Sequence, residues 1–186
     1  MMNSNIVNNS MFFLNKQITK NITMKKLTWN TLLQSNAGLG SLALRIPVGI
    51  ILAAHGAQKL FGWFGGYGLE GTGAWMASIG LEPGYLMALL AGSAEFFGGL
   101  ALILGFLTRP AAAVSAFVVL VAIFSVHISH GLFLSNNGYE FALSLFAATL
   151  ALAIQGGGSL SIDNKLGIFL HKNVSTQLND SSPAAV

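Results

Sequence analysis

An apolar run from residue 84 to 108, GYLMALLAGSAEFFGGLALILGFLT, is long enough to cross a bilayer and carries one charge, Glu95, near its centre. A helix needs about 20 predominantly apolar residues to span the hydrocarbon core of a membrane. Three further apolar segments occupy residues 39–61, 110–133 and 139–156. The sequence therefore predicts an all-α fold, a transmembrane bundle of four helices.

The composition excludes an ordinary soluble domain. Charged residues make up 8% of the chain and hydrophobic residues 53%, whereas soluble domains carry about 25% charged residues. Cysteine is absent, which excludes disulfides, thiol redox chemistry and iron–sulfur ligation. The basic residues lie where a topology signal would place them. We therefore expect the lipid bilayer as a partner and no nucleic acid.

The chain divides into three predicted parts. Residues 1–38 form a polar, basic tail, residues 39–158 the four-span membrane domain, and residues 159–186 a cytoplasmic segment. The tail lacks the pattern of a cleaved signal peptide, and the sequence leaves open whether Met1 or Met24 is the true start. In the last part four apolar side chains share one helical face, which predicts a helix at the membrane surface: Ile162, Leu166, Phe169 and Leu170.

The three connections between the spans differ in character. The first is rich in glycine and in aromatic residues such as Trp63, Tyr67 and Trp75, which suit a membrane–water interface. The second is predicted as the short turn 108–110, with Pro110 in the first turn of the next helix. The third centres on residues 135–138. A short second connection makes the helices on either side antiparallel neighbours.

The basic residues outside the spans predict the orientation. Four lysines lie in the tail, Arg109 in the second connection, and Lys165 and Lys172 after the last span, while the first and third connections have none. Basic residues favour the cytoplasmic side. We expect both termini in the cytoplasm and the glycine- and aromatic-rich connection outside.

The first span, LALRIPVGIILAAHGAQKLFG, carries three basic or titratable side chains. At 100° per residue, Arg45, His55 and Lys59 fall within an arc of about 80° and share one face. Pro47 either starts this helix or kinks it. Polar residues within spans are costly, so they are functional candidates by default.

Glu95 lies on a face of the second span that small residues also occupy. Ala91 and Gly99 are one turn on either side of it, and small residues allow a neighbouring helix to approach closely. The rise per residue places Glu95 between Arg45 and His55 in depth. Three other polar residues are expected near the outer ends of spans three and four: His127, His130 and Glu140.

Two interpretations of this polar core stay open. In the structural one, Glu95 pairs with Arg45 and fixes the helix packing. In the functional one, Glu95 and His55 are the candidate catalytic proton relay. A polar pocket for substrate then comprises Arg45, Lys59, His127, His130 and Glu140. A buried structural ion pair is expensive in lipid, which favours the functional interpretation. HxxH alone predicts no metal site, and a haem pair such as His55 with His127 is the weaker alternative.

The residues resemble the DoxX family of small membrane proteins. The resemblance rests on LRIPVGIILAAHGAQKLFG, AGSAEFFGGLALILGFLTRPAA, VAIFSVHISHG, the Asn-Gly-Tyr-Glu start of the fourth span and GGGSLSID, and covers residues 40–165. It implies a four-helix integral membrane bundle in a bacterial inner (plasma) membrane, linked to quinone-dependent redox or oxidative-stress systems. The family's recurring polar residues match Arg45, His55, Lys59, Glu95, Arg109 and Glu140.

Three functions follow as hypotheses. The first is a subunit of a quinone-linked membrane oxidoreductase, which would need partner redox subunits because the chain has no electron carrier of its own. The second is a transporter for a small solute or protons, for which four spans imply a homo-oligomer. The third is a non-enzymatic assembly factor. The sequence identifies no cofactor, although a quinone fits it better than haem does.

Overall fold

A computed structural model describes residues 16–17, 35 and 37–169. Most of the predicted tail, the alternative start at Met24, and residues 170–186 lie outside these residues, and so does the predicted surface position of Leu170. The chain divides into two compact units, residues 1–32 and 33–186. All the elements named here belong to the second unit.

The second unit is built of helices, and its described residues contain no strand. The helices are α2 (Gly38–Phe61), α3 (Gly68–Ser78), α4 (Gly84–Leu104), α5 (Thr108–Ala122) and α6 (Glu140–Gln155). α5 continues through a π-helical turn, η2 (Ile123–His127), and a 3₁₀ turn, η3 (Ile128–His130), while η1 (Trp63–Gly65) and η4 (Leu134–Asn136) are short 3₁₀ turns. A further helix covers residues 162–169.

Three helices are long and apolar enough to cross a membrane: Gly38–Phe61, Gly84–Leu104 and Thr108–His130. α6 is also apolar but has 16 residues. These four helices coincide with the four predicted segments to within a few residues at each end. The prediction of an all-α membrane bundle is confirmed.

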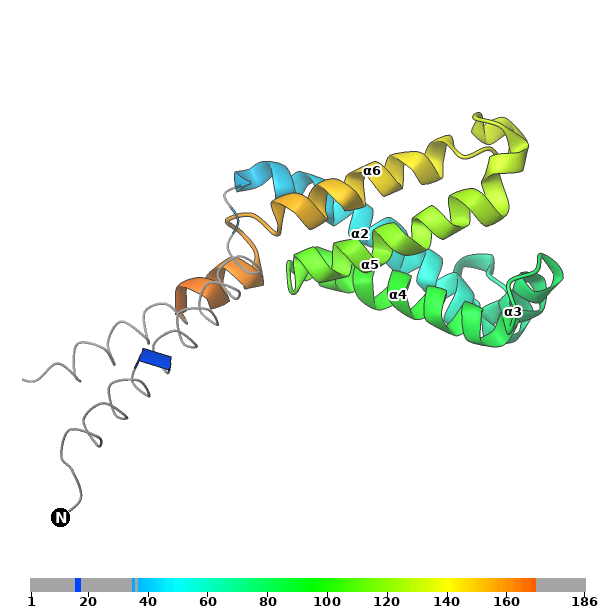
Figure 1. Cartoon of the computed structure of the whole chain (residues 1–186), viewed down its shortest axis with the longest axis horizontal. Coiled ribbons are helices and arrows are strands. Elements are labelled where there is room, and N and C mark those ends of the chain that lie inside the picture. Colours follow the sequence, from blue (N-terminus) through cyan, green and yellow to red (C-terminus); the bar gives the residue numbers. More distant parts are fainter. Residues whose placement is uncertain (1–15, 18–34, 36, 170–186) are drawn as a thin grey trace, which may run out of the picture. The chain divides into compact units, whose positions relative to one another are not determined.

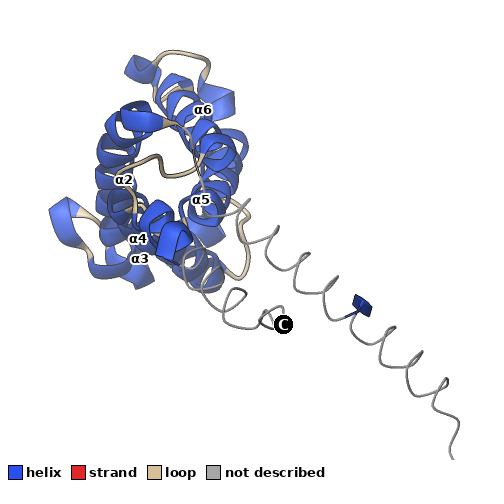
Figure 2. Ribbon diagram, turned by 90° about the vertical axis from the view of Figure 1, so that its left-hand side faces the viewer, coloured by secondary structure: helices blue, strands red, loops and turns tan. Residues whose placement is uncertain are grey.

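The four long helices surround a common core (Figures 1 and 2). α2 packs against α4 and α6, and α5 packs against the same two helices, so that α2 and α5 face each other diagonally. α3 lies across α4 and α2 at one end of the bundle. The core is apolar, with side chains from each of the four helices: Val48, Leu52, Leu102, Ala112, Val119, Ala142, Leu145 and Leu152.

Glycines set the spacing and the register of α2 against α4. A Cβ atom added to Gly56 would lie 2.3 Å from the backbone nitrogen of Phe96, and one added to Gly99 would lie 2.5 Å from that of Ala53. The two backbones are therefore in contact, which only glycine permits. This register places Arg45 beside the C-terminal end of α4 and places Glu95 at the depth of His55 and Gly56.

The turn between α4 and α5 lies earlier than the sequence suggested. α4 ends at Leu104, Gly105 adopts a left-handed conformation (φ 66°), and α5 begins at Thr108. The connection is thus Gly105–Leu107, and the predicted turn 108–110 is wrong because those residues already belong to α5. Pro110 lies in the first turn of α5, as predicted, where its missing N–H costs no helical hydrogen bond.

The structure differs from the sequence-based expectation at Pro47 and in the first connection. α2 begins at Gly38, so Pro47 lies inside the helix and does not start it. The first connection contains α3, whose sequence GLEGTGAWMAS has three glycines and no clear apolar period. α3 forms because it packs closely on α4: a Cβ atom on Gly84 would lie 2.1 Å from the carbonyl oxygen of Gly73.

The outer faces of the helices expose large apolar side chains. Examples from four helices are Ile50, Phe97, Phe117 and Ile154, which are 55–68% exposed. A soluble protein would not expose so much apolar surface. These faces are suited to contact with acyl chains.

Candidate functional site

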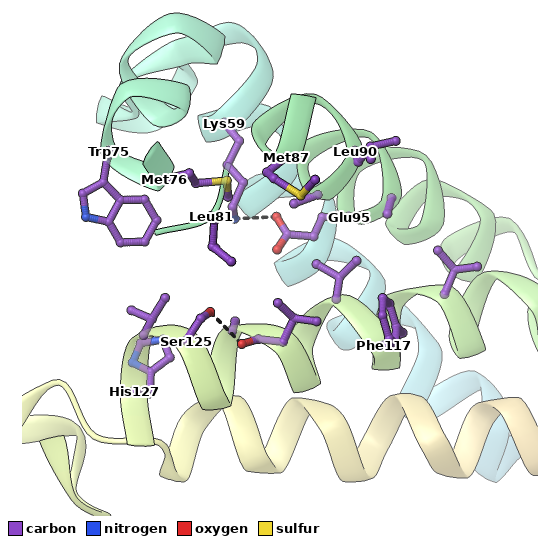
Figure 3. A pocket seen from close by; sticks show the side chains of 17 residues that line it. Lys59, Trp75, Met76, Leu81, Met87, Leu90, Glu95, Phe117, Ser125 and His127 are labelled. Atoms are coloured by element: carbon purple, nitrogen blue, oxygen red, sulfur yellow. Dashed lines mark hydrogen bonds and ion pairs between the residues drawn. The ribbon is translucent and has the colours of Figure 1, made fainter. Parts of the chain in front are cut away.

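A cavity of about 450 Å³ lies between α4 and α5 and reaches the α3 end of the bundle. That volume is within the range of small-molecule sites. Most of its wall is apolar, as Figure 3 shows. α3, α4 and the loop between them supply Trp75, Met76, Leu81, Met87, Leu90, Ala91 and Ala94, while α5 and η2 supply Val114, Phe117, Val118, Val121, Ala122, Ser125 and Val126. Three titratable residues complete the wall: Lys59, Glu95 and His127.

Lys59 and Glu95 form an ion pair at one side of the cavity (Figure 3). The Lys59 Nζ atom lies 2.5 Å from Oε2 of Glu95, and Glu95 is 6% exposed. A buried carboxylate is tolerated only when it is paired. Helical side chains lean toward the N-terminus of their helix. Lys59 can therefore reach Glu95 of α4, which lies at the depth of His55, one turn before Lys59 on α2. This bond uses one of the three N–H groups of the ammonium.

His127 enters the cavity from the opposite wall. It ends the π-helical turn η2, and π-helical turns occur often at functional sites. Its Nδ1 atom lies 2.8 Å from the carbonyl oxygen of Asn137. Because a carbonyl can only accept, Nδ1 carries the proton and donates it to this bond. The Nε2 atom of a neutral imidazole is then left with a lone pair that can accept a hydrogen bond.

Arg45 does not pair with Glu95, contrary to the structural interpretation of the sequence. It is 2% exposed and donates to the carbonyl oxygens of Leu102 (3.1 Å), Ile103 (2.9 Å) and Leu160 (2.6 Å). The last carbonyls of a helix have no partner within it. Arg45 therefore caps the C-terminal end of α4, and the register of α2 against α4 holds it away from the cavity.

Asp163 joins this end of the bundle from the C-terminal helix, residues 162–169. Its carboxylate accepts hydrogen bonds from the backbone N–H groups of Leu107 (2.7 Å) and Thr108 (2.8 Å). These groups begin α5, where a helix presents unpaired donors and the positive end of its dipole. Arg109 likewise donates to carbonyl oxygens at the end of α6, including that of Ile154. Arg45, Arg109 and Asp163 thus form a capping cluster that ties helix ends together.

The other predicted polar residues lie outside the cavity wall. His55 is exposed, and its ring centroid is 6.3 Å from that of Phe141. His130 is exposed and bonds through Nδ1 to the carbonyl oxygen of Val126. Glu140 accepts from the backbone N–H of Leu134 at 2.6 Å and so holds the connection before α6. The shared face of Arg45, His55 and Lys59 therefore does not make one pocket.

Sequence reasoning missed several parts of the site. The apolar wall was not identified, because its residues look like those of any membrane span in the sequence. Only the divergence of α4 and α5 in the structure makes them the lining of a cavity. Asp163 lies in the GGGSLSID segment used for the resemblance, and one signal was available: it is an acidic residue directly after the last span. Within the described part of the chain, no group of three or more His, Asp or Glu side chains could hold a metal ion.

Comparisons with known proteins agree with this architecture. The DoxX family model matches residues 40–128. The chain is similar to the "Inner membrane protein YqjF" of Escherichia coli, with 34% identity over 69% of this chain and 92% of that protein. It is also similar to the "Putative oxidoreductase CatD" of Bacillus subtilis, with 32% identity over 67% of this chain and 85% of that protein.

A third relative, the "Inner membrane protein YphA" of Escherichia coli, is 33% identical over 67% of this chain and 88% of its own length. No solved structure matches the chain. The two Escherichia coli relatives are named as inner membrane proteins, and three helices of the structure are long and apolar enough to span a membrane. The chain belongs to the DoxX family and is a multi-pass inner membrane protein.

Proposed function

We propose that the protein is a quinone-binding subunit of a membrane redox system. The observation that carries this proposal is the Lys59–Glu95 ion pair in the wall of a mostly apolar cavity within the membrane domain. A quinone has a flat apolar ring and two carbonyl oxygens that need hydrogen-bond donors. The Lys59 ammonium supplies donors on one wall, and His127 lies on the other.

The polar residues are also suited to proton transfer. Reduction of a quinone to a hydroquinone takes two electrons and two protons. We assign the electrons to a redox subunit that associates with this chain. Glu95 and His127 are the groups in the wall that can exchange protons with the ring oxygens. His55, one turn before Lys59 on α2, is a candidate to carry protons to the pair from outside the cavity.

The name of the Bacillus subtilis relative supports a redox role. The closed end of the bundle favours binding over transport. There Arg45, Asp163 and Thr108 are all 2% exposed or less, and none of them lines the cavity. A path through the protein would have to break the capping cluster, whereas a binding site needs only the cavity that is present.

Quenching of Trp75 fluorescence tests the proposal, because Trp75 lines the cavity and quinones quench indole emission. The protein is placed in nanodiscs with Trp29→Phe and Trp63→Phe, so that Trp75 is the remaining tryptophan. We expect a decyl-substituted benzoquinone to quench Trp75 saturably. Lys59→Met should weaken its binding by about tenfold or more, since a hydrogen bond from a charged donor contributes about 1.5–3 kcal/mol.

Two histidine variants provide the matched controls. His130→Gln alters an exposed ring outside the cavity and should leave the dissociation constant unchanged. His55→Gln should also leave it unchanged while slowing the proton uptake, measured with a pH indicator, that follows reduction of the bound quinone by reduced methyl viologen, which gives up electrons without releasing protons. Equal quinone affinity in the parent, Lys59→Met and Glu95→Gln proteins would remove the proposed site.

A further inference from the structure

The helices α4 and α5 diverge from a tight contact near their middle. At Gly98 an added Cβ atom would lie 2.6 Å from the Oγ atom of Ser115, so the two helices touch there. Toward the α3 end, the positions facing α5 are Ala94, Ala91 and Met87, and all three line the cavity. Two of these are alanines, which leave the space between the helices unfilled. The cavity therefore occupies a fork between α4 and α5.

The open side of this fork lies among lipid-facing residues. Four apolar side chains of α4 and α5 that line the cavity are more than a third exposed: Leu90 (56%), Val114 (51%), Phe117 (66%) and Val121 (38%). Exposure this large places these side chains at the rim, where the cavity opens. Figure 3 shows Leu90 and Phe117 on opposite sides of the space that contains Glu95.

The rim lies at the depth of the hydrocarbon core. Phe117 is nine residues after the start of α5 at Thr108, about 14 Å along the helix axis, and the hydrocarbon core is about 30 Å thick. Leu90 lies within α4, six residues after its start at Gly84. Neither rim residue carries a polar group, so acyl chains, not water, are the medium that this opening meets.

We infer that the cavity has a lateral portal, defined by Leu90, Val114, Phe117 and Val121, through which an amphiphilic ligand enters from the bilayer. The polar head of the ligand reaches the Lys59–Glu95 pair, and its hydrocarbon tail leaves between α4 and α5 into the lipid. The identity of the head as a quinone rests on the proposed function, whereas the portal itself rests on the geometry of the fork. The ligand therefore needs no passage through either aqueous phase.

A spin label tests which medium fills the cavity, whatever the head group is. The chain has no cysteine, so a nitroxide can be attached at Ala94→Cys inside the cavity, at Leu100→Cys on the lipid-facing side of α4, and at the exposed Ser78→Cys of α3. In nanodiscs, we expect the label at residue 94 to collide with oxygen as the label at residue 100 does. Collision with a water-soluble nickel chelate at the level seen for residue 78 would overturn the portal.

A reversible plug tests the route of entry. Leu90 and Leu89 are neighbouring exposed leucines of α4, but only Leu90 lines the cavity. Leu90→Cys treated with benzyl methanethiosulfonate should bind the decyl benzoquinone about tenfold more slowly, measured by Trp75 quenching in the Trp29→Phe, Trp63→Phe background. Leu89→Cys with the same reagent should bind at the untreated rate. Removing the benzyl group with dithiothreitol, followed by dialysis, should restore the rate.

The outcomes separate the portal from the proposed function. An unchanged rate in benzyl-modified Leu90→Cys would overturn the entry route. If the unmodified protein bound no quinone, the proposed function would fail, and the spin label at residue 94 would still decide whether the cavity opens to lipid. A methyl-substituted benzoquinone without a long tail provides a further comparison: binding as tight as that of the decyl compound would contradict the placement of the tail in the portal.

Discussion

The two buried charges on neighbouring helices, Arg45 and Glu95, are satisfied in different ways. Glu95 has one ionic partner, Lys59, beside a cavity. Arg45 donates to three backbone carbonyl oxygens from two segments. A charge held by backbone groups at a helix end contributes mainly to the fold, whereas a charge pair beside an empty space is available to a ligand.

Replacement of Arg45 by lysine should therefore lower stability without changing the cavity. A lysine ammonium cannot reproduce the planar fork that bonds two carbonyls through one nitrogen and a third through the other. We expect a loss of about 2 kcal/mol in the free energy of unfolding, seen as a lower melting temperature in detergent. Quinone affinity at low temperature should match that of the parent protein. A tenfold change in affinity at unchanged melting temperature would place Arg45 in the site instead.

Asp163→Asn tests the cap on α5. The amide keeps the shape of the side chain but loses the charge, and one of its two terminal atoms can no longer accept a hydrogen bond. We expect destabilisation of about 1–3 kcal/mol, because a buried N–H group is left without a partner. Glu70→Gln, an exposed carboxylate in the first turn of α3, is the control. Equal melting temperatures for the two variants would contradict the capping role.

At the residue scale, the sequence could show that charges lie within spans but not which ones meet. Projection at 100° per residue placed Arg45 and Lys59 on one face of α2. It could not give the register of α2 against α4, which depends on where glycines such as Gly56 and Gly99 allow backbone contact. That register brings Lys59, not Arg45, to Glu95. His127 lines the cavity from the end of a π-helical turn. Such a turn changes the direction in which the side chains point, and no sequence pattern predicted it here.

Secondary-structure elements were predicted best where composition alone decides them. The long apolar segments became α2, α4, α5 and α6 because a lipid core admits few alternatives to a helix. α3 was missed because its helix depends on packing against α4 and not on its own pattern. The start of α5 was misplaced because Asp163, far along the chain, supplies its cap.

The α2–α4 interface gives a prediction at the scale of elements. Gly99→Ala would place a methyl group 2.5 Å from backbone atoms of α2, at Ala53 and Gly49, and backbone cannot move aside as a side chain can. We expect destabilisation of about 1–3 kcal/mol. Gly40→Ala is the matched control, because nothing lies within 4 Å of a Cβ atom there and alanine favours a helix. Similar melting temperatures for both alanine variants would show that the contact is not tight.

For the whole molecule, the orientation in the membrane stays a prediction that cysteine labelling can check. Single cysteines at Ser78, in α3, and at Lys165, in the C-terminal helix, occupy exposed positions at opposite ends of the chain's membrane domain. From the distribution of lysine and arginine, we expect a membrane-impermeant maleimide to label residue 78 in intact cells and residue 165 only after permeabilisation. The reverse pattern would invert the topology.

The hydrogen bonds of Asp163 have a mechanical consequence for the molecule. They fasten the start of α5 at the same end where Arg45 holds the last turn of α4, so that the two helices share an anchored end and part only toward α3. A bulkier ligand in the cavity must then be accommodated by a tilt of α4 and α5 about that anchored end. The resulting displacement is largest in the leaflet beside α3.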